Sequence, residues 1–133
     1  MKTGLLLITH GSLGSDLLET AIAILNACPI RTETIAVAPD CDPDEIFASA
    51  NRLCRDLDEG YGVLVLTDLF GSTPSNIAVR LAEAHNVYVI SGANIPMLLR
   101  VLNYSSLCLA ELAEKAASGA RDGVIITPSK KAG

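Results

Sequence analysis

His10 is the side chain in this sequence best suited to nucleophilic chemistry. It follows an apolar run that starts at Leu5, and it directly precedes Gly11 and a helical pattern. A neutral imidazole is a good nucleophile near pH 7, provided that its second ring nitrogen is held in place. Asp68 is the one acid at the end of another apolar run, and a carboxylate there would fix the ring. We therefore predict a catalytic pair of His10 and Asp68. The alternative is a structural His10 bonded to a backbone carbonyl.

A second group of candidates lies in Gly71, Ser72 and Thr73, which precede Pro74 at the start of a predicted helix. Free N–H groups and the dipole at a helix start favour a bound anion, and the two hydroxyls add donors. We predict phosphate binding by these three residues, with ordinary helix capping by Ser72 or Thr73 as the alternative. The chain contains no GxxxxGK[ST] loop and no GxGxxG after its first strand, so nucleotide binding is poorly supported.

Further residues could line the same crevice. Thr9 and Gly11 flank His10, and Asn94 follows another strand, where it could either cap a helix or face the ligand. Ser72 could also act as a nucleophile beside His10 and Asp68, but the sequence lacks a GxSxG elbow. We expect no metal and no cofactor, because no pair of acids at the crevice suggests magnesium and no cysteine spacing suggests zinc. The four cysteines are expected to be free thiols (Cys28, Cys41, Cys54 and Cys108).

The elements that position these residues alternate along the chain. Predicted strands cover residues 3–9, 32–38, 62–67, 86–91 and 123–127; predicted helices run from 13 or 16 to before 29, and over 43–57, 74–84, 96–102 and 107–118. This order predicts an α/β fold with a doubly wound, mainly parallel sheet, whose strand ends share one edge. The fifth strand, 123–127, is expected at the sheet edge, where it invites pairing with another chain. Residues 128–133 are expected to be a frayed tail.

Composition limits the class of protein. A length of 133 residues suits one domain, and we expect a single domain over 1–133. The formal net charge of −5 and the 4% aromatic content disfavour nucleic-acid binding. No apolar run is long enough to span a bilayer and no secretory signal begins the chain, so we expect a cytoplasmic protein without membrane insertion.

Three motifs together resemble one known family. They are Thr9-His10-Gly11, the block from Asp68 to Asn76 (DLFGSTPSN) and the stretch from Gly92 to Leu98 (GANIPML). The chain resembles, over essentially its whole length, the IIA domain of the mannose/fructose/sorbose-type permeases of the bacterial phosphoenolpyruvate–sugar phosphotransferase system. Thr73 stands where that family usually has serine.

The resemblance implies a phosphotransferase that relays phosphate stoichiometrically in sugar uptake. His10 would accept phosphate from the phosphocarrier protein HPr and pass it to a IIB partner, Asp68 would bond the other ring nitrogen, and Ser72-Thr73 would donate to the phosphoryl group. The resemblance also implies a homodimer in which the C-terminal strand, antiparallel to its new neighbours, crosses to the partner sheet. We expect a stand-alone IIA. Two alternatives stay open: a regulatory phosphoprotein of an incomplete system, or a module that binds small anions or nucleotides.

Overall fold

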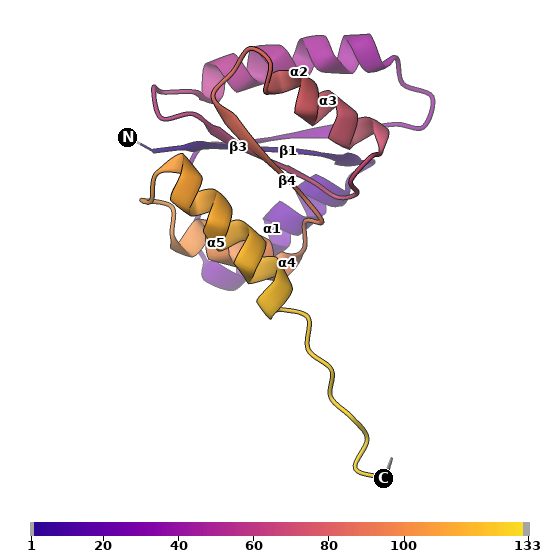
Figure 1. The fold of residues 1–133 in the computed structure, drawn as a ribbon, viewed down its shortest axis with the longest axis vertical. Helices are drawn as coiled ribbons and strands as arrows, with labels where there is room; N and C mark the ends of the chain where they lie inside the picture. The colour runs from indigo at the N-terminus through magenta and orange to yellow at the C-terminus, as the bar shows by residue number, and fades with distance from the viewer. Residues whose placement is uncertain (1, 132–133) are drawn as a thin grey trace.

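The protein is a three-layer α/β sandwich in which helices cover both faces of one parallel sheet (Figure 1). The computed structural model describes residues 2–131. The elements are β1 (Gly4–His10), α1 (Leu13–Leu25), β2 (Thr32–Val37), α2 (Pro43–Leu57), β3 (Val63–Thr67), α3 (Thr73–Leu81), β4 (Val87–Ser91), α4 (Ile95–Asn103) and α5 (Leu109–Asp122). The predicted α/β class, the parallel sheet and the alternation of strands and helices are confirmed.

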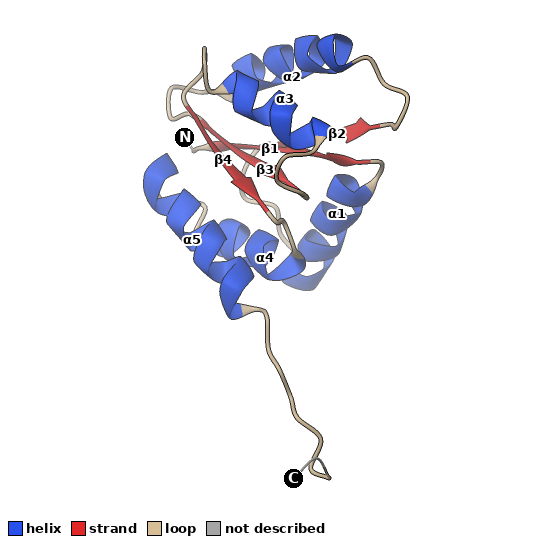
Figure 2. Cartoon of the chain, turned by 45° about the vertical axis from the view of Figure 1, so that its right-hand side comes forward, coloured by secondary structure: helices blue, strands red, loops and turns tan. Residues whose placement is uncertain are grey.

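The two central strands are continuous apolar runs because both of their faces are covered. In β1 and β3, residues 4–9 and 63–67 are all buried. Helices α2 and α3 pack on one face, while α1, α4 and α5 pack on the other (Figures 1 and 2). Successive side chains of a strand point to opposite faces, so Leu6 and Ile8 belong to the first core and Leu5 and Leu7 to the second.

The strand order is β2-β1-β3-β4, and all neighbouring strands are parallel. The last pair that joins β1 to β3 is Ile8 with Thr67. The residues that follow this pair therefore leave the sheet at the same edge and on adjacent strands, which brings the loops after His10 and after Thr67 side by side. Strand β4 lies beyond β3, so its loop is one strand further from His10.

The C-terminal segment differs from the sequence-based prediction. Helix α5 continues to Asp122, beyond the predicted end at 118, and residues 123–127 pair with no strand of the described chain. This segment extends away from the body as an irregular tail (Figure 2). A β-branched sequence becomes a strand only where a neighbouring backbone is available, and the chain itself places none beside this segment. Predicted tail residues 132–133 lie outside the described residues.

The remaining boundaries differ by a few residues. Helix α3 ends at Leu81 instead of 84, and α5 begins at Leu109 instead of 107. Asp42 caps α2, since its side chain accepts a hydrogen bond from the Asp44 N–H. In residues 2–131, no helix has both the length and the apolarity that crossing a membrane requires.

Candidate functional site

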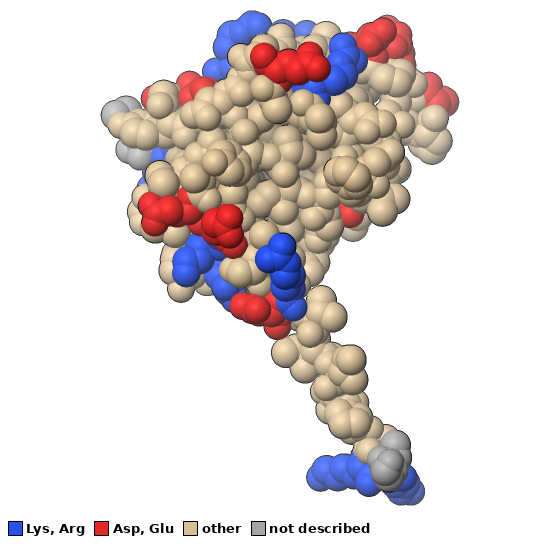
Figure 3. Space-filling view, viewed as in Figure 1, with Lys and Arg blue, Asp and Glu red and all other residues tan. Residues whose placement is uncertain are grey.

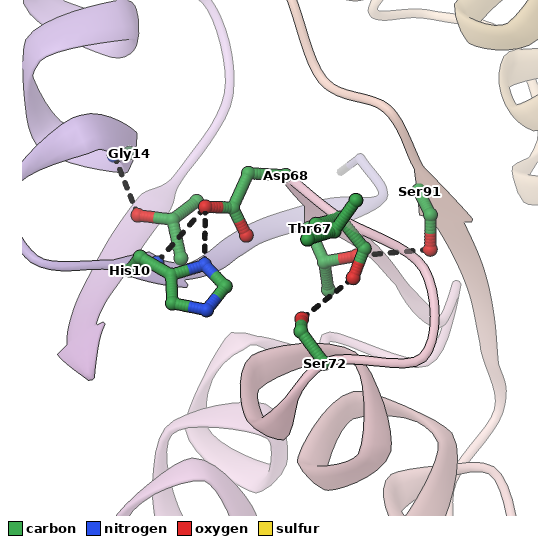
Figure 4. Close-up of polar contacts among 8 residues, drawn as sticks. His10, Gly14, Thr67, Asp68, Ser72 and Ser91 are labelled. Carbon is green, nitrogen blue, oxygen red and sulfur yellow. Dashed lines mark hydrogen bonds and ion pairs between the residues drawn. The ribbon is translucent and has the colours of Figure 1, made fainter. Parts of the chain in front are cut away.

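His10 and Asp68 meet at the carboxyl edge of the sheet, as the sequence predicts. His10 is the last residue of β1, and Asp68 directly follows β3. The Asp68 Oδ2 atom lies 2.8 Å from the His10 ring nitrogen Nδ1 and accepts a second hydrogen bond, of 3.1 Å, from the His10 backbone N–H (Figure 4). One carboxylate oxygen therefore fixes both the backbone and the ring of the histidine.

The environment of Asp68 determines which ring nitrogen is free. Burial alone would raise the pKa of Asp68, but the hydrogen bonds from the His10 ring and backbone outweigh it and hold that pKa below its ordinary value. The carboxylate is therefore ionised at neutral pH and can only accept, so His10 Nδ1 carries the proton. The lone pair of Nε2 remains available. The His10 side chain is 52% exposed and the Asp68 side chain only 10%, so Nε2 belongs to the accessible part of the pair.

The turn after Asp68 is held by its own side chains. The Ser72 hydroxyl donates to the Leu69 carbonyl at 2.6 Å, and the Gly71 N–H donates to the buried Ser75 hydroxyl at 3.2 Å. Gly71 has φ +83, a conformation that favours glycine. In this structure, the donors of Gly71 and Ser72 would have to leave these partners to reach a phosphoryl oxygen. Their observed role is to shape the turn.

Among the three predicted phosphate-binding residues, Thr73 is the one whose hydrogen-bond donors have no partner in the described chain. It is the first residue of α3 and exposed, and its hydroxyl makes no hydrogen bond to any part of the described chain. Pro74 follows and lacks an N–H, so the start of α3 presents few donors besides those of Thr73. In the view of Figure 4, Ser72, which directly precedes this helix start, and the His10 ring both lie below Asp68.

The structure corrects the prediction for Thr9. Its side chain is completely buried, and its hydroxyl accepts the Gly14 N–H at 2.7 Å, so it braces the start of α1 and does not line the crevice. Gly11 is exposed beside His10, and its N–H donates to the carbonyl of Val37. These contacts fix the loop after β1 to its neighbouring elements.

Asn94 acts as a helix cap, the first of its two predicted roles. Its side-chain oxygen accepts the Met97 N–H at 2.9 Å, and its amide donates to the carbonyl of Ala120. It lines a cavity of about 320 Å³ between the end of β4 and α5, together with Ser91, Gly92 and Arg121. Neither His10 nor Asp68 is among the residues that line this cavity.

Sequence reasoning missed two supporting contacts. Ser75 holds the turn through Gly71, and Thr67, the residue before Asp68, donates to the Ser91 hydroxyl at 3.0 Å (Figure 4). A serine four residues after a turn glycine is a weak local signal for the first contact. The second depends on the pairing of β3 with β4 in register, Thr67 beside Ser91, which no local pattern encodes.

The remaining titratable groups form no second centre among residues 2–131. The four cysteines are free there, and no group of three or more His, Cys, Asp or Glu residues gathers in a way that could hold a metal ion. Cys54 is fully buried, and burial raises the pKa of its thiol to about 11. The arrangement that can do chemistry is thus an accessible imidazole nitrogen, oriented by an ionised carboxylate and adjacent to a helix start.

Comparison with known proteins agrees with this site. The sequence profile described as "PTS system fructose IIA component" matches residues 4–118, which include every residue of the site. The chain belongs to this phosphotransferase-system IIA family. The resemblance found in the three motifs is thereby confirmed. Members of this IIA family are phosphotransferase components of sugar uptake.

Relatives of this IIA protein include longer chains. The mannose-specific EIIAB component of the phosphotransferase system from Escherichia coli K12 is 33% identical over 103 residues, which are 77% of this chain and 32% of that protein. The chain thus spans about a third of the length of this relative. The fructose-specific EIIA component from Bacillus subtilis 168 is 42% identical over 54 residues, 40% of this chain and 37% of that one.

Solved structures share the fold. The mannose/sorbose-specific IIA subunit from Enterococcus faecalis superposes with a TM-score of 0.86 at 21% identity, covering 98% of each chain. The IIA protein associated with the fucose utilization operon of Streptococcus pneumoniae superposes with a TM-score of 0.73 at 29% identity, covering 89% of this chain and 93% of that one. The sheet and helices of this IIA protein are therefore those of the family.

Proposed function

We propose that this IIA protein is a phosphohistidine carrier that accepts phosphate from HPr on His10 and passes it to a IIB partner. The observation that supports this most directly is the 2.8 Å contact between His10 Nδ1 and Asp68 Oδ2, which leaves an exposed Nε2 with a free lone pair. Such a nitrogen is a nucleophile toward phosphorus and needs no further activation at neutral pH.

The proposed transfer conserves protons on the ring. The Nε2 lone pair attacks the phosphorus atom of phospho-HPr, an Nε2–P bond forms, and the N–P bond in the donor breaks, so that its electron pair returns to the donor imidazole. His10 Nδ1 keeps its proton throughout. The ring becomes cationic as the new bond forms, and the Asp68 carboxylate beside Nδ1 stabilises that charge. Transfer to IIB is the same step in reverse, with a new acceptor.

Positioning of the phosphoryl oxygens is assigned to the start of α3. Phosphoryl transfer through a loose transition state requires orientation and donors for the oxygens more than covalent help. We assign the donor role to the hydroxyl and N–H of Thr73, because the donors of Ser72 and Gly71 are engaged within their own turn. The dipole of α3 adds a favourable field for the negative charge.

We further propose a cytoplasmic homodimer in which the tail of each chain adds an antiparallel fifth strand to its partner's sheet. Val124, Ile125 and Ile126 are between 74% and 90% exposed, a costly arrangement for three consecutive large apolar residues. Strand β4 has no neighbour on its outer side within the described chain. If the tail of one chain were added beside the partner's β4 as a fifth strand, its apolar side chains would be buried and the open backbone groups of β4 would be paired. Sedimentation should give a dimer for the native chain and a monomer after Ile125→Asp. A native monomer would refute the exchange.

The carrier proposal is tested by intact mass after incubation with phosphoenolpyruvate, enzyme I and HPr. The native chain should gain one acid-labile phosphoryl group, and His10→Ala should gain none. His85→Ala is the matched control, because His85 is the other histidine of the chain. Its ring nitrogen Nε2 forms a hydrogen bond with the side chain of Asn51 and with no residue of the His10–Asp68 pair. Its labelling should equal that of the native chain. Labelling of His10→Ala would refute the assignment.

A further inference from the structure

A second cavity lies at the amino edge of the sheet, the edge opposite to His10. Its volume is about 210 Å³, and its lining comes from the segments before β1, before β3 and before α5 (Lys2, Thr3, Tyr61, Ser106, Leu107 and Cys108). Figures 1 and 2 show the beginning of β1 beside the beginning of α5. Pockets for drug-sized ligands enclose about 300–1,000 Å³, so this cavity suits a smaller molecule.

Thr3 carries a buried hydroxyl that lacks a partner. The residue is only 2% exposed, and its Oγ1 atom forms no hydrogen bond with any of residues 2–131. An unpaired buried hydroxyl costs free energy, and a valine would fill nearly the same space without that cost. Such a group therefore points to a missing partner, such as an ion or a ligand. Because Thr3 lines the cavity, a molecule seated there can supply that partner.

The other polar groups around the cavity are mainly hydrogen-bond donors. The Lys2 ammonium has three N–H donors, one of which reaches the Ser105 hydroxyl at 3.4 Å. Tyr61 and Ser106 add exposed hydroxyls. Cys108 is the N-cap of α5 and forms no side-chain cap, so the N–H groups in the first turn of this helix are left for another acceptor. A concentration of donors at a helix start favours a bound anion.

The loop that carries Tyr61 is braced before any ligand arrives. The Asp58 Oδ1 atom accepts the N–H groups of Gly60 and Gly62, at 2.8 and 2.9 Å, so Tyr61 lies between two fixed residues. A Cβ at Gly62 would lie 2.7 Å from Leu109 Cδ2, which shows that this loop packs directly on the first residue of α5. Preassembly of this kind lowers the entropy cost of binding.

The charge of the lining limits the class of anion. Lys2 is the only charged residue among those that line the cavity within residues 2–131. Figure 3 shows acidic groups on the outer surface of the first half of α5, where Glu111 and Glu114 are exposed, but neither lines the cavity. The Glu111 Oε1 atom instead accepts the Cys108 thiol at 3.0 Å. One ammonium with several neutral donors fits a single oxyanion group better than a polyanion.

We propose that this cavity binds the phosphate group of a small metabolite. The Lys2 ammonium and the hydroxyls of Tyr61 and Ser106 donate to the phosphate oxygens. The Thr3 hydroxyl donates to the same group and thereby gains its missing partner, and the dipole of α5 favours the negative charge. The site is separate from phosphoryl transfer, because neither His10 nor Asp68 lines the cavity. Inorganic phosphate offers the same chemistry as a phosphate ester, and the test compares the two.

The test follows the backbone amide signals of the isotope-labelled full chain by NMR. The chain is titrated with glycerol phosphate, with inorganic phosphate, and with NaCl at matched ionic strength. Both phosphates should shift the amides of Thr3, Tyr61 and Leu109 in a saturable way, and the tighter Kd identifies the ester or the free ion as the ligand. Shifts confined to residues 68–75, no saturable shift at all, or equal shifts with NaCl would overturn the site.

Two variants test the donors. Lys2→Met and Thr3→Val should each raise Kd about tenfold, the usual loss for a hydrogen bond to a charged group. Lys130→Met is the matched control, because it removes the same charge from the exposed tail, and its Kd should equal that of the native chain.

Thr3→Val has a second readout in the free chain. It should raise Tm, because it removes an unpaired buried hydroxyl. A lower Tm, or an unchanged Kd in both Lys2→Met and Thr3→Val, would contradict the proposal. Labelling of His10 by phospho-HPr should be normal in both variants, so failure of this site leaves the carrier function standing.

Discussion

Replacing Asp68 by Asn removes one charge and keeps the shape of the side chain. The carboxylate oxygen Oδ2 accepts from both the backbone N–H and the Nδ1 of His10, at 3.1 and 2.8 Å. The amide has one oxygen to accept these bonds and carries no charge to stabilise the cationic ring. Its NH₂ group can also turn toward Nδ1. The ring would then hold its proton on Nε2, where the lone pair is needed.

The expected loss of rate follows from the two hydrogen bonds. A hydrogen bond to a charged group contributes about 1.5–3 kcal/mol, against about 0.5–1.5 kcal/mol between neutral groups. Asp68→Asn removes the charge that faces the ring as it becomes cationic in the transition state, and it weakens the backbone bond that orients the ring; together these changes raise the barrier by about 2–3 kcal/mol. Since about 1.4 kcal/mol corresponds to a factor of ten, Asp68→Asn should slow phosphorylation of His10 by about 30- to 150-fold.

The assay is single-turnover phosphorylation by phospho-HPr, quenched at intervals and followed by intact mass. Asp40→Asn is the control, because it removes an exposed carboxylate from the same edge of the sheet without touching His10. It should not reproduce the loss in the transfer step at saturating phospho-HPr. Urea unfolding checks that Asp68→Asn remains folded. A folded Asp68→Asn protein that transfers within about threefold of the native rate would refute the role given to the carboxylate.

Other predictions concern the pH dependence of stability, the packing around two glycines, and the residues that donate hydrogen bonds to the phosphoryl group. The lowered pKa of Asp68 stabilises the fold above the unfolded value of about 3.9 and stops doing so as pH falls through the folded pKa. Urea unfolding should therefore show a larger stability difference between the native chain and Asp68→Asn at pH 7 than at pH 2. Gly62→Ala places a Cβ 2.7 Å from neighbouring backbone and side-chain atoms at φ +81, and should cost about 2–4 kcal/mol in urea unfolding. Gly60→Ala, at φ +101 with nothing within 4 Å, should cost only about 1–2 kcal/mol. Thr73→Val should slow single-turnover transfer by about tenfold, and Ser72→Ala by less, because the Ser72 hydroxyl donates within its own turn.

Most of the fold could be predicted from hydrophobic patterns. Continuous apolar runs over 5–8 and 63–66 indicate strands covered on both faces, and the structure places both at the centre of the sheet. The pairing of His10 with Asp68 was also predictable, because both follow such runs and parallel strands end at one edge. Helix ends were less accurate, since a helix stops where packing and caps allow, and the pattern alone extended α3 to 84.

The rest depends on contacts that a linear pattern does not contain. The segment 123–127 has strand propensity, but a strand needs a neighbouring backbone, and the described chain offers none there. Thr9 was expected in the crevice because of its position beside His10. The alternation of side chains instead turns it into the body, where it accepts the Gly14 N–H. The hydroxyl of Ser72 could have pointed to a ligand, and only the turn geometry commits it to Leu69.

The two hydrogen bonds that one carboxylate oxygen of Asp68 accepts from His10 have a consequence for timing. Backbone N–H, side chain and Oδ2 close a ring of atoms, so both χ1 and χ2 of His10 are fixed although its side chain is 52% exposed. An exposed histidine without this ring changes rotamer within picoseconds to nanoseconds. Here Nε2 keeps one direction before any partner arrives. Even a brief encounter thus finds the nucleophile aligned, and no search over rotamers separates collision from transfer.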